Sequence, residues 1–197
     1  MLAALILSAG ASSRMGRPKA LLPYREGTFL QHLLDVTRHP KIGVTRVVLG
    51  AGANEIRTAA KLDPSVVVLN SHWEKGQLSS ICEGVRSLAN IETDGIVLCP
   101  VDHPLVSARL VNDLVEQFYK SGKAIVVPTF NGRRGHPAIF SKALYSELLA
   151  APPEKGARTV VWAHAADVLE VPTDEEGIIL NINDPDMLRH IAGPDQI

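Results

Sequence analysis

The sequence predicts an α/β fold in which a mostly parallel, doubly wound sheet lies between two layers of helices. Short unbroken runs of Val, Ile and Leu recur along the chain, as is typical of strands buried on both faces. Segments whose apolar residues repeat with helical period lie between these runs, which is the order of βαβ units. The 197 residues contain 46% hydrophobic residues and no linker or repeat, so 1–197 is expected to form a single domain.

The predicted elements follow from these two patterns. Continuous apolar runs predict strands over 2–7, 46–49, 66–69, 95–99 and 124–127, and another such run before residue 180 predicts a last strand. The first helix is expected over 28–38, because Thr28 and Gln31 have the spacing of a capping box. The other helices are expected over 78–89, 110–119, 142–150 and 156–165, the last two separated by a proline-containing loop.

Composition and charge narrow the functional classes. The net charge of −1 gives no global basic field, so neither nucleic acid nor an acidic membrane is an expected partner. Cys82 and Cys99 lack metal-ligand spacing and are interpreted as buried thiols in a reducing compartment. The apolar N-terminus is too short for a targeting segment, and no run approaches a membrane span. We therefore expect a cytoplasmic protein.

The loop that follows the first predicted strand, residues 8–19, is rich in small residues and cations. Ligands of open α/β sheets bind at the carboxyl ends of strands, and small residues let the backbone approach a ligand closely. Arg14, Arg17 and Lys19 place three positive charges within six residues, with Ser12 and Ser13 as further donors. This loop suits a polyphosphate.

The spacing of the loop excludes two well-known phosphate motifs. Five residues separate Gly10 from Gly16, and Lys19 lies three residues further on, whereas a Walker A loop needs four residues and an immediate lysine. The dinucleotide fingerprint fails because Ser12 and Met15 occupy its glycine positions. A flexible, solvated loop is the alternative interpretation.

Four further segments at predicted strand or helix ends carry polar side chains, and each has a structural alternative. Asp102 follows the strand at 95–99, but it could instead cap a helix that begins near Ser107. Ser79 and Ser80 open a helix and could be ordinary small residues there. The last two segments are Arg133-Arg134-Gly135-His136, which could be a solvated turn with a structural histidine, and Asn181-Ile182-Asn183-Asp184-Pro185, in which Asp184 and Pro185 suit a helix N-terminus.

The glycine-rich segment, Leu7-Ser8-Ala9-Gly10-x-Ser12-x-Arg14-Met15-Gly16-x-Pro18-Lys19-x-Leu21-Leu22, resembles the signature of MobA-like nucleotidyltransferases. Its Ala9-Gly10 and Pro18-Lys19 variants are more similar to the molybdenum cofactor cytidylyltransferase branch than to the guanylyltransferase branch. The resemblance extends over nearly the whole chain and implies a Rossmann-like nucleotidyltransferase fold. It also implies that Arg14 and Lys19 neutralise a triphosphate and that Lys19 stabilises the transition state.

The resemblance implies roles for the remaining segments as well. Asp102 is the implied ligand of Mg²⁺, with Asn181 as a second ligand, although the amide departs from an acidic version of that segment. Ser80 and the backbone near Gly76 would read a pyrimidine, which favours CTP. The implied nucleotide-binding residues are Leu7, Ser8, Ala9, Gly10, Arg14, Lys19, Asn70, Gly76, Ser80 and Pro100. The implied acceptor-binding residues are Arg134, Gly135, His136 and Asn183.

The reaction implied is transfer of CMP from CTP to the phosphate of a molybdopterin-type cofactor, with Lys19, Arg14 and Asp102 as catalytic residues. The attacking oxygen would belong to the substrate, and catalysis would rest on positioning and charge neutralisation. A molybdenum hydroxylase or its maturation chaperone is a further candidate partner. Three alternatives stay open: a guanylyltransferase, a sugar-1-phosphate nucleotidyltransferase and a non-catalytic accessory of cofactor maturation.

Overall fold

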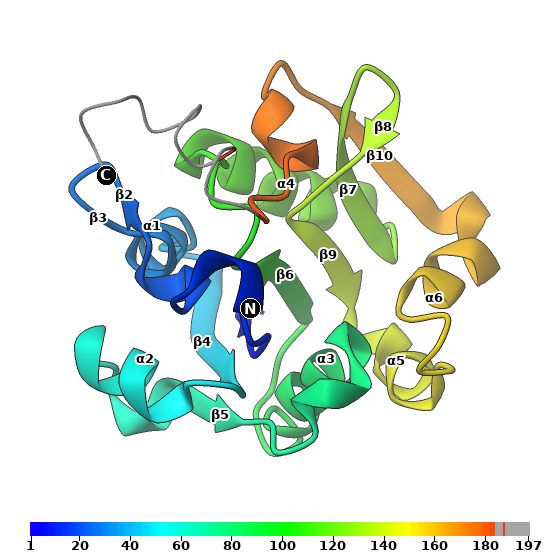
Figure 1. Cartoon of the computed structure of the whole chain (residues 1–197). Coiled ribbons are helices and arrows are strands. Elements are labelled where there is room, and N and C mark those ends of the chain that lie inside the picture. Colours follow the sequence, from blue (N-terminus) through cyan, green and yellow to red (C-terminus); the bar gives the residue numbers. More distant parts are fainter. Residues whose placement is uncertain (184–186, 188–197) are drawn as a thin grey trace.

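The computed structural model describes residues 1–183 and 187, and its centre is an eight-stranded sheet (Figure 1). The strand order is β10-β7-β9-β6-β1-β4-β5, and β8 pairs with β7. The pairs β1–β4, β1–β6, β4–β5 and β7–β10 are parallel, whereas β9 is antiparallel to both β6 and β7. The predicted, mostly parallel α/β sheet is confirmed. Asp184 and Pro185, read as a helix N-terminus, lie outside the described residues.

Five of the strands coincide with the apolar runs of the sequence. These are β1 (Leu2–Ser8), β4 (Ile42–Leu49), β5 (Val67–Leu69), β6 (Gly95–Pro100) and β7 (Ile125–Phe130). The other strands are β8 (Arg133–Arg134), β9 (Ala138–Ser141) and β10 (Val168–Pro172), with a separate hairpin of β2 (Pro23–Tyr24) and β3 (Gly27–Thr28). The carboxyl ends of β1 and β6 lie side by side in the sheet.

The helices are α1 (Phe29–Val36), α2 (Ala53–Ala59), α3 (Gln77–Arg86), α4 (Ala108–Ser121), α5 (Tyr145–Ala150) and α6 (Arg158–Ala163). The Thr28 hydroxyl caps α1 by accepting from the Gln31 amide at 3.2 Å. The Gln31 side chain bonds to Asp35 instead of returning to Thr28, so half of the predicted capping box forms. The structure adds α2, which the sequence did not predict.

Two apolar cores cover the two faces of the sheet, which gives the predicted three layers. Leu2 and Ile6 of β1 point into a core shared with α1, α2 and α4. Leu5 and Leu7 point to the opposite face and pack with α3, α5 and α6. Helix α3 lies close to β1 because Gly84 has no side chain, and a Cβ there would lie 2.2 Å from Leu5 Cδ1. No helix within residues 1–183 is both long and apolar enough to cross a membrane.

The prediction of a last strand before residue 180 is wrong. Residues Glu176–Ile179 form a 3-10 turn, and their backbone groups bond to neighbouring loops instead of a strand ladder. The Ile178 carbonyl accepts from the His136 amide at 2.9 Å, and the Ile182 amide donates to the Asp102 carbonyl at 2.8 Å. We call residues 176–183 the strap, because these two bonds attach it to the loops after β8 and β6. The buried apolar side chains Ile178 and Ile182 anchor it to the core.

Candidate active site

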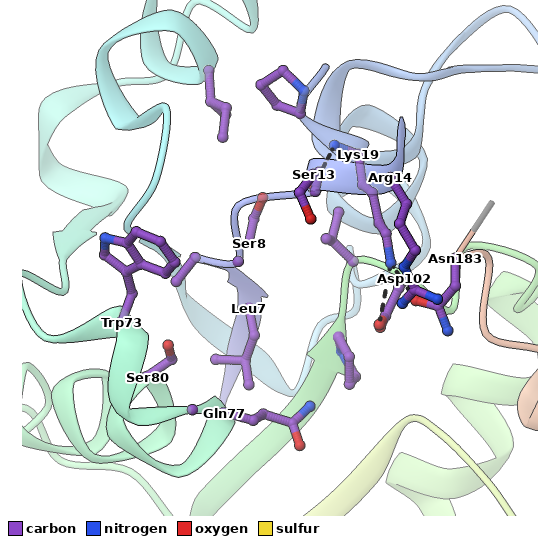
Figure 2. A pocket seen from close by; sticks show the side chains of 18 residues that line it. Leu7, Ser8, Ser13, Arg14, Lys19, Trp73, Gln77, Ser80, Asp102 and Asn183 are labelled. Atoms are coloured by element: carbon purple, nitrogen blue, oxygen red, sulfur yellow. Dashed lines mark hydrogen bonds and ion pairs between the residues drawn. The ribbon is translucent and has the colours of Figure 1, made fainter. Parts of the chain in front are cut away.

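A cavity of about 290 Å³, here called the loop cavity, opens at the carboxyl ends of β1 and β6 (Figure 2). It is lined by Leu7, Ser8, Ala9, Gly10, Ser12, Ser13, Arg14, Pro18, Lys19, Ile56, Trp73, Gly76, Gln77, Ser80, Pro100, Val101, Asp102 and Asn183. Figure 2 shows Arg14, Lys19, Asp102 and Asn183 gathered at one end and Trp73 with Ser80 at the other. The charged end suits phosphates, and the other end suits a base.

The loop after β1 is held in shape by its own serine and by the end of β4. Ser12 has a positive φ of 51°, its carbonyl accepts from Met15, and its hydroxyl accepts from the Lys19 amide at 3.1 Å. The Ala51 amide donates to the Ala9 carbonyl at 3.0 Å, an approach that leaves no space for a side chain at Gly50. These contacts favour a defined conformation of the loop, although many of its residues are exposed to solvent. Arg17, counted among the phosphate-binding cations, does not line the cavity.

Lys19 reaches from this loop across the cavity to two oxygen atoms. Its Nζ donates to Asn183 Oδ1 at 2.6 Å and lies 3.7 Å from Asp102 Oδ2. Burial lowers the pKa of Lys19, the Asp102 carboxylate opposes this shift, and the Arg14 charge adds to it. Two cations thus face one carboxylate in a half-buried site. A polyanion would compensate the excess positive charge.

Asp102 does not cap the helix that follows it. The Ser107 hydroxyl caps α4 by accepting from the Leu110 amide at 3.1 Å, and Glu175 in turn accepts from the Ser107 amide at 3.0 Å. The capping alternative for Asp102 is therefore wrong, and its carboxylate faces the loop cavity beside Lys19.

The donor set of the loop cavity fits a hard divalent cation that is bound mainly by substrate. Residues 1–183 contain no group of three His, Cys, Asp or Glu side chains arranged to hold a metal ion. Mg²⁺ needs few protein carboxylates when phosphate oxygens and water complete its octahedron, so Asp102 alone suits that role. Asn181, named as a second ligand, does not line the cavity, and its buried Oδ1 has no hydrogen-bond partner in the described chain.

Asn70 supports the base end of the cavity without lining it. Its side chain is buried, and its Nδ2 donates to Ser79 Oγ at 2.9 Å and to Ser80 Oγ at 3.0 Å. Asn70, predicted to bind a nucleotide, is therefore not placed to contact a ligand of the loop cavity directly. Ser80 and Gly76 do line the cavity, as predicted.

Sequence reasoning missed five residues that line the cavity: Pro18, Ile56, Trp73, Gln77 and Val101. Ile56 comes from α2, whose signal was the helical spacing of Ala53, Ile56 and Ala60. Trp73 and Gln77 lie near Gly76 in the sequence, and this proximity was the signal that could have identified them.

A second cavity of about 640 Å³ adjoins the first, and Gln77 lines both. It contains three of the predicted acceptor-binding residues, Arg134, Gly135 and His136, whereas the fourth, Asn183, lies in the loop cavity. The guanidinium of Arg134 is paired with Glu170 at 2.7 Å. The further cations at its wall are Arg133, Lys155 and Arg158. The second cavity is thus basic and shares Gln77 with the loop cavity.

Two half-buried histidines line the second cavity near Asp102. The rings of His103 and His136 lie 4.9 Å apart, and neither Nδ1 has a hydrogen-bond partner in the described chain. Burial, aided by the neighbouring His103 and opposed by Asp102, lowers the pKa of His136 to about 4. Burial also lowers the pKa of His103, although Asp102 raises it. Both rings are neutral at neutral pH.

The fold, which has a cationic cavity at its strand ends, is one found in solved nucleotidyltransferases. Residues 4–168 match the family described as MobA-like NTP transferase domain, and the chain belongs to this family. The resemblance drawn from the glycine-rich loop is thereby confirmed at the level of the family.

Two relatives carry different names. A probable molybdenum cofactor guanylyltransferase of Bacillus mycoides is 32% identical over 133 residues, which cover 67% of this chain and 64% of that protein. The chain thus spans slightly less than two thirds of that relative. A nicotine blue oxidoreductase of Paenarthrobacter nicotinovorans is 32% identical over 148 residues, which cover 71% of each protein.

The fold is also found in a solved mycobacterial structure. Rv0371c from Mycobacterium tuberculosis H37Rv superposes with a TM-score of 0.80 at 30% identity, covering 97% of this chain and 96% of that one. A structure of Rv0371c in complex with manganese superposes with a TM-score of 0.76 at 27% identity, covering 97% of each chain.

Proposed function

We propose that this protein transfers a nucleoside monophosphate from a nucleoside triphosphate to the terminal phosphate of a molybdopterin-type cofactor, releasing pyrophosphate. The observation that carries the proposal is the placement of Arg14, Lys19 and Asp102 at one end of a cavity that meets a second, basic cavity. The name of the Bacillus relative supports the acceptor. The proposal for the acceptor rests on that likeness, because a fold alone does not define a substrate.

The chemistry follows from the charges of the site. Arg14 and Lys19 bind the triphosphate. Asp102 and Asn183 orient the ammonium group of Lys19, which both of them contact. A divalent ion, proposed to be Mg²⁺, would supply neutralisation of the phosphate oxygens when it is bound at Asp102. An oxygen of the acceptor phosphate attacks the α-phosphorus, and the bond to the leaving pyrophosphate breaks as the new P–O bond forms. Lys19 stabilises the negative charge that develops on the departing oxygens.

CTP is the proposed donor, and GTP is the second candidate. Ser80, supported by Asn70, offers a hydroxyl to a base at the Trp73 end of the cavity, which favours a small base with an acceptor edge. The name of the Bacillus relative favours GTP instead. The name of a second relative, a nicotine blue oxidoreductase, points to a different activity, which would release no pyrophosphate.

The decisive experiment measures pyrophosphate release from CTP, GTP, ATP and UTP, each with and without molybdopterin and Mg²⁺. The proposal expects release only when both substrates and the metal are present, with CTP as the best donor. Release with GTP alone among the nucleotides would move the assignment to a guanylyltransferase. No release with any pair, despite nucleotide binding, would instead favour a non-catalytic accessory role in the maturation of a molybdenum enzyme.

A further inference from the structure

The hydrogen bonds around Asn70 fix the orientation of its side-chain amide. The backbone N–H of His72 can only donate, and it lies 2.9 Å from the atom assigned as Asn70 Oδ1. The other end of the amide must therefore be the Nδ2 group, with its two hydrogens. Because Asn70 is only 2% exposed, both hydrogens are directed to neighbours inside the protein. Ser79 Oγ and Ser80 Oγ are those neighbours, at 2.9 and 3.0 Å.

The two serines differ in what is left for their own protons. Ser79 Oγ accepts from Asn70 and donates to the Gly76 carbonyl at 2.7 Å, with the His72 carbonyl also within reach at 3.1 Å. Ser80 Oγ accepts from Asn70, but its own proton has no hydrogen-bond acceptor among the described residues. Ser80 lines the loop cavity, and Figure 2 shows its oxygen directed toward the space between Trp73 and Leu7. Ser80 is thus left with a free proton at the base end.

We propose that Asn70 biases base specificity: its amide occupies one lone pair of the Ser80 hydroxyl and thereby turns the hydroxyl proton toward the base. The inference rests on the proposed function, because it assumes that a nucleotide base occupies the Trp73 end of the loop cavity. Asn70 acts through Ser80 and does not touch the base, so it is a positioning residue. Its contribution is to determine whether the Ser80 hydroxyl donates a hydrogen bond to the base or accepts one from it.

The class of base follows from the polarity of that hydroxyl. A donor at the edge of the base selects an unprotonated ring nitrogen or a carbonyl oxygen and leaves a ring N–H without an acceptor. Cytosine has an unprotonated N3, whereas N3 of uracil and N1 of guanine carry protons. On the premise that Ser80 faces ring position 3 of a pyrimidine, it favours cytosine over uracil, two bases of the same size that differ in polarity at this ring atom.

The substitution Asn70→Asp inverts this polarity with little change in shape. One carboxylate oxygen still accepts from the His72 amide, but the other can only accept from Ser79 and Ser80. The Ser80 proton then turns inward, and its lone pairs face the base. The inverted hydroxyl accepts from the N3–H of uracil and no longer donates to N3 of cytosine.

The test measures the affinities of the whole protein for CTP and UTP by calorimetry in the presence of Mg²⁺. The wild type is expected to bind CTP at least about tenfold more tightly than UTP, and Asn70→Asp is expected to abolish or reverse that ratio. Ser80→Ala removes the donor and should bring the two affinities together. Ser79→Ala is the matched control, because Ser79 shares the Asn70 amide but does not line the cavity, and it should keep the ratio of the wild type.

The outcomes separate the inference from the proposed function. An equal loss of affinity for CTP and UTP in Asn70→Asp, or an unchanged ratio in Ser80→Ala, overturns the inference and leaves nucleotide transfer standing. A wild type that binds no nucleoside triphosphate overturns both. If Asn70→Asp does not fold, as judged by its thermal unfolding, Asn70→Ala decides the question, because it frees the Ser80 lone pair and should reduce the ratio of CTP to UTP affinity.

Discussion

The ammonium group of Lys19 donates to Asn183 Oδ1 at 2.6 Å, which joins the loop of residues 8–19 to a residue 164 positions further along the chain. The strap brings Asn183 to this place through the bond between the Ile182 amide and the Asp102 carbonyl. Lys19 is therefore held between an amide and a carboxylate before any ligand arrives. A preorganised cation costs less reorganisation when charge develops in a transition state.

Lys19→Ala is expected to lower kcat about a hundredfold, because it removes a charge that stabilises the transition state. The measurement is the initial rate of pyrophosphate release with saturating donor and acceptor. Arg17→Ala is the control, since Arg17 carries the same charge in the same loop but does not line the cavity. Turnover of the Lys19 variant close to that of the Arg17 variant would contradict the role given to Lys19.

Asp102→Asn is expected to abolish metal-dependent turnover while the protein stays folded. The amide keeps the shape of the side chain but lacks the negative charge that attracts a divalent cation. Calorimetry in the presence of nucleotide should show that binding of Mn²⁺ or Mg²⁺ becomes too weak to detect. Asp113→Asn, on the exposed side of α4, is the matched control. Metal affinity that is equal in the two variants would exclude Asp102 as a ligand.

The stability of the protein should fall as pH drops from about 6.5 to about 4, partly through His136. Its pKa is lowered from 6.5 to about 4 in the folded state, so the unfolded chain binds a proton that the native protein does not. Linkage then makes the free energy of unfolding decrease with falling pH across this window, by roughly 3 kcal/mol for a shift of this size.

Denaturant unfolding of wild type and His136→Asn at pH 7.5 and 4.5 measures this contribution. The variant should lose less stability between the two pH values, because it has no imidazole to protonate. His72→Asn, at an exposed position, should behave like the wild type. Identical pH dependence in all three proteins would show that His136 does not titrate as described.

Gly84→Ala should destabilise the fold without changing base preference. Its new methyl group would meet the buried Leu5 side chain at 2.2 Å, and such overpacking costs about 1–3 kcal/mol. The free energy of unfolding and the ratio of CTP to GTP affinity are to be measured together. Glu83→Ala, which alters an exposed ion pair next to it, should cost less than about 1 kcal/mol. A change in the affinity ratio would assign Gly84 a role in binding.

The sequence predicted the elements whose signal is local. Strands buried on both faces, such as β1 and β6, are marked by continuous apolar residues, and α4 is marked by its periodic ones. Strand β9 has only a short apolar run, and its place between β6 and β7 is decided by tertiary pairing. Strand β10 is an edge strand with partly exposed residues, so it lacks the apolar signal of the central strands.

The same distinction applies to the site. Arg14 and Lys19 belong to a short cationic loop at a strand end that indicates phosphate chemistry, whereas the metal role of Asp102 was implied only by the family resemblance. The bond from Lys19 to Asn183 depends on how the strap folds back, which no local pattern encodes. The supporting role of Asn70 was likewise hidden, because burial and hydrogen-bond partners are properties of the folded chain.

The shared position of Gln77 in both cavities has a consequence for the kinetics of the proposed reaction. In the proposed reaction, two adjoining cavities would allow donor and acceptor to be bound at the same time, and the nucleotidyl group would then pass directly to the acceptor. Initial-rate measurements with both substrates varied should give intersecting double-reciprocal lines, the pattern of a ternary complex. Parallel lines would instead indicate a nucleotidylated protein that forms before the acceptor binds.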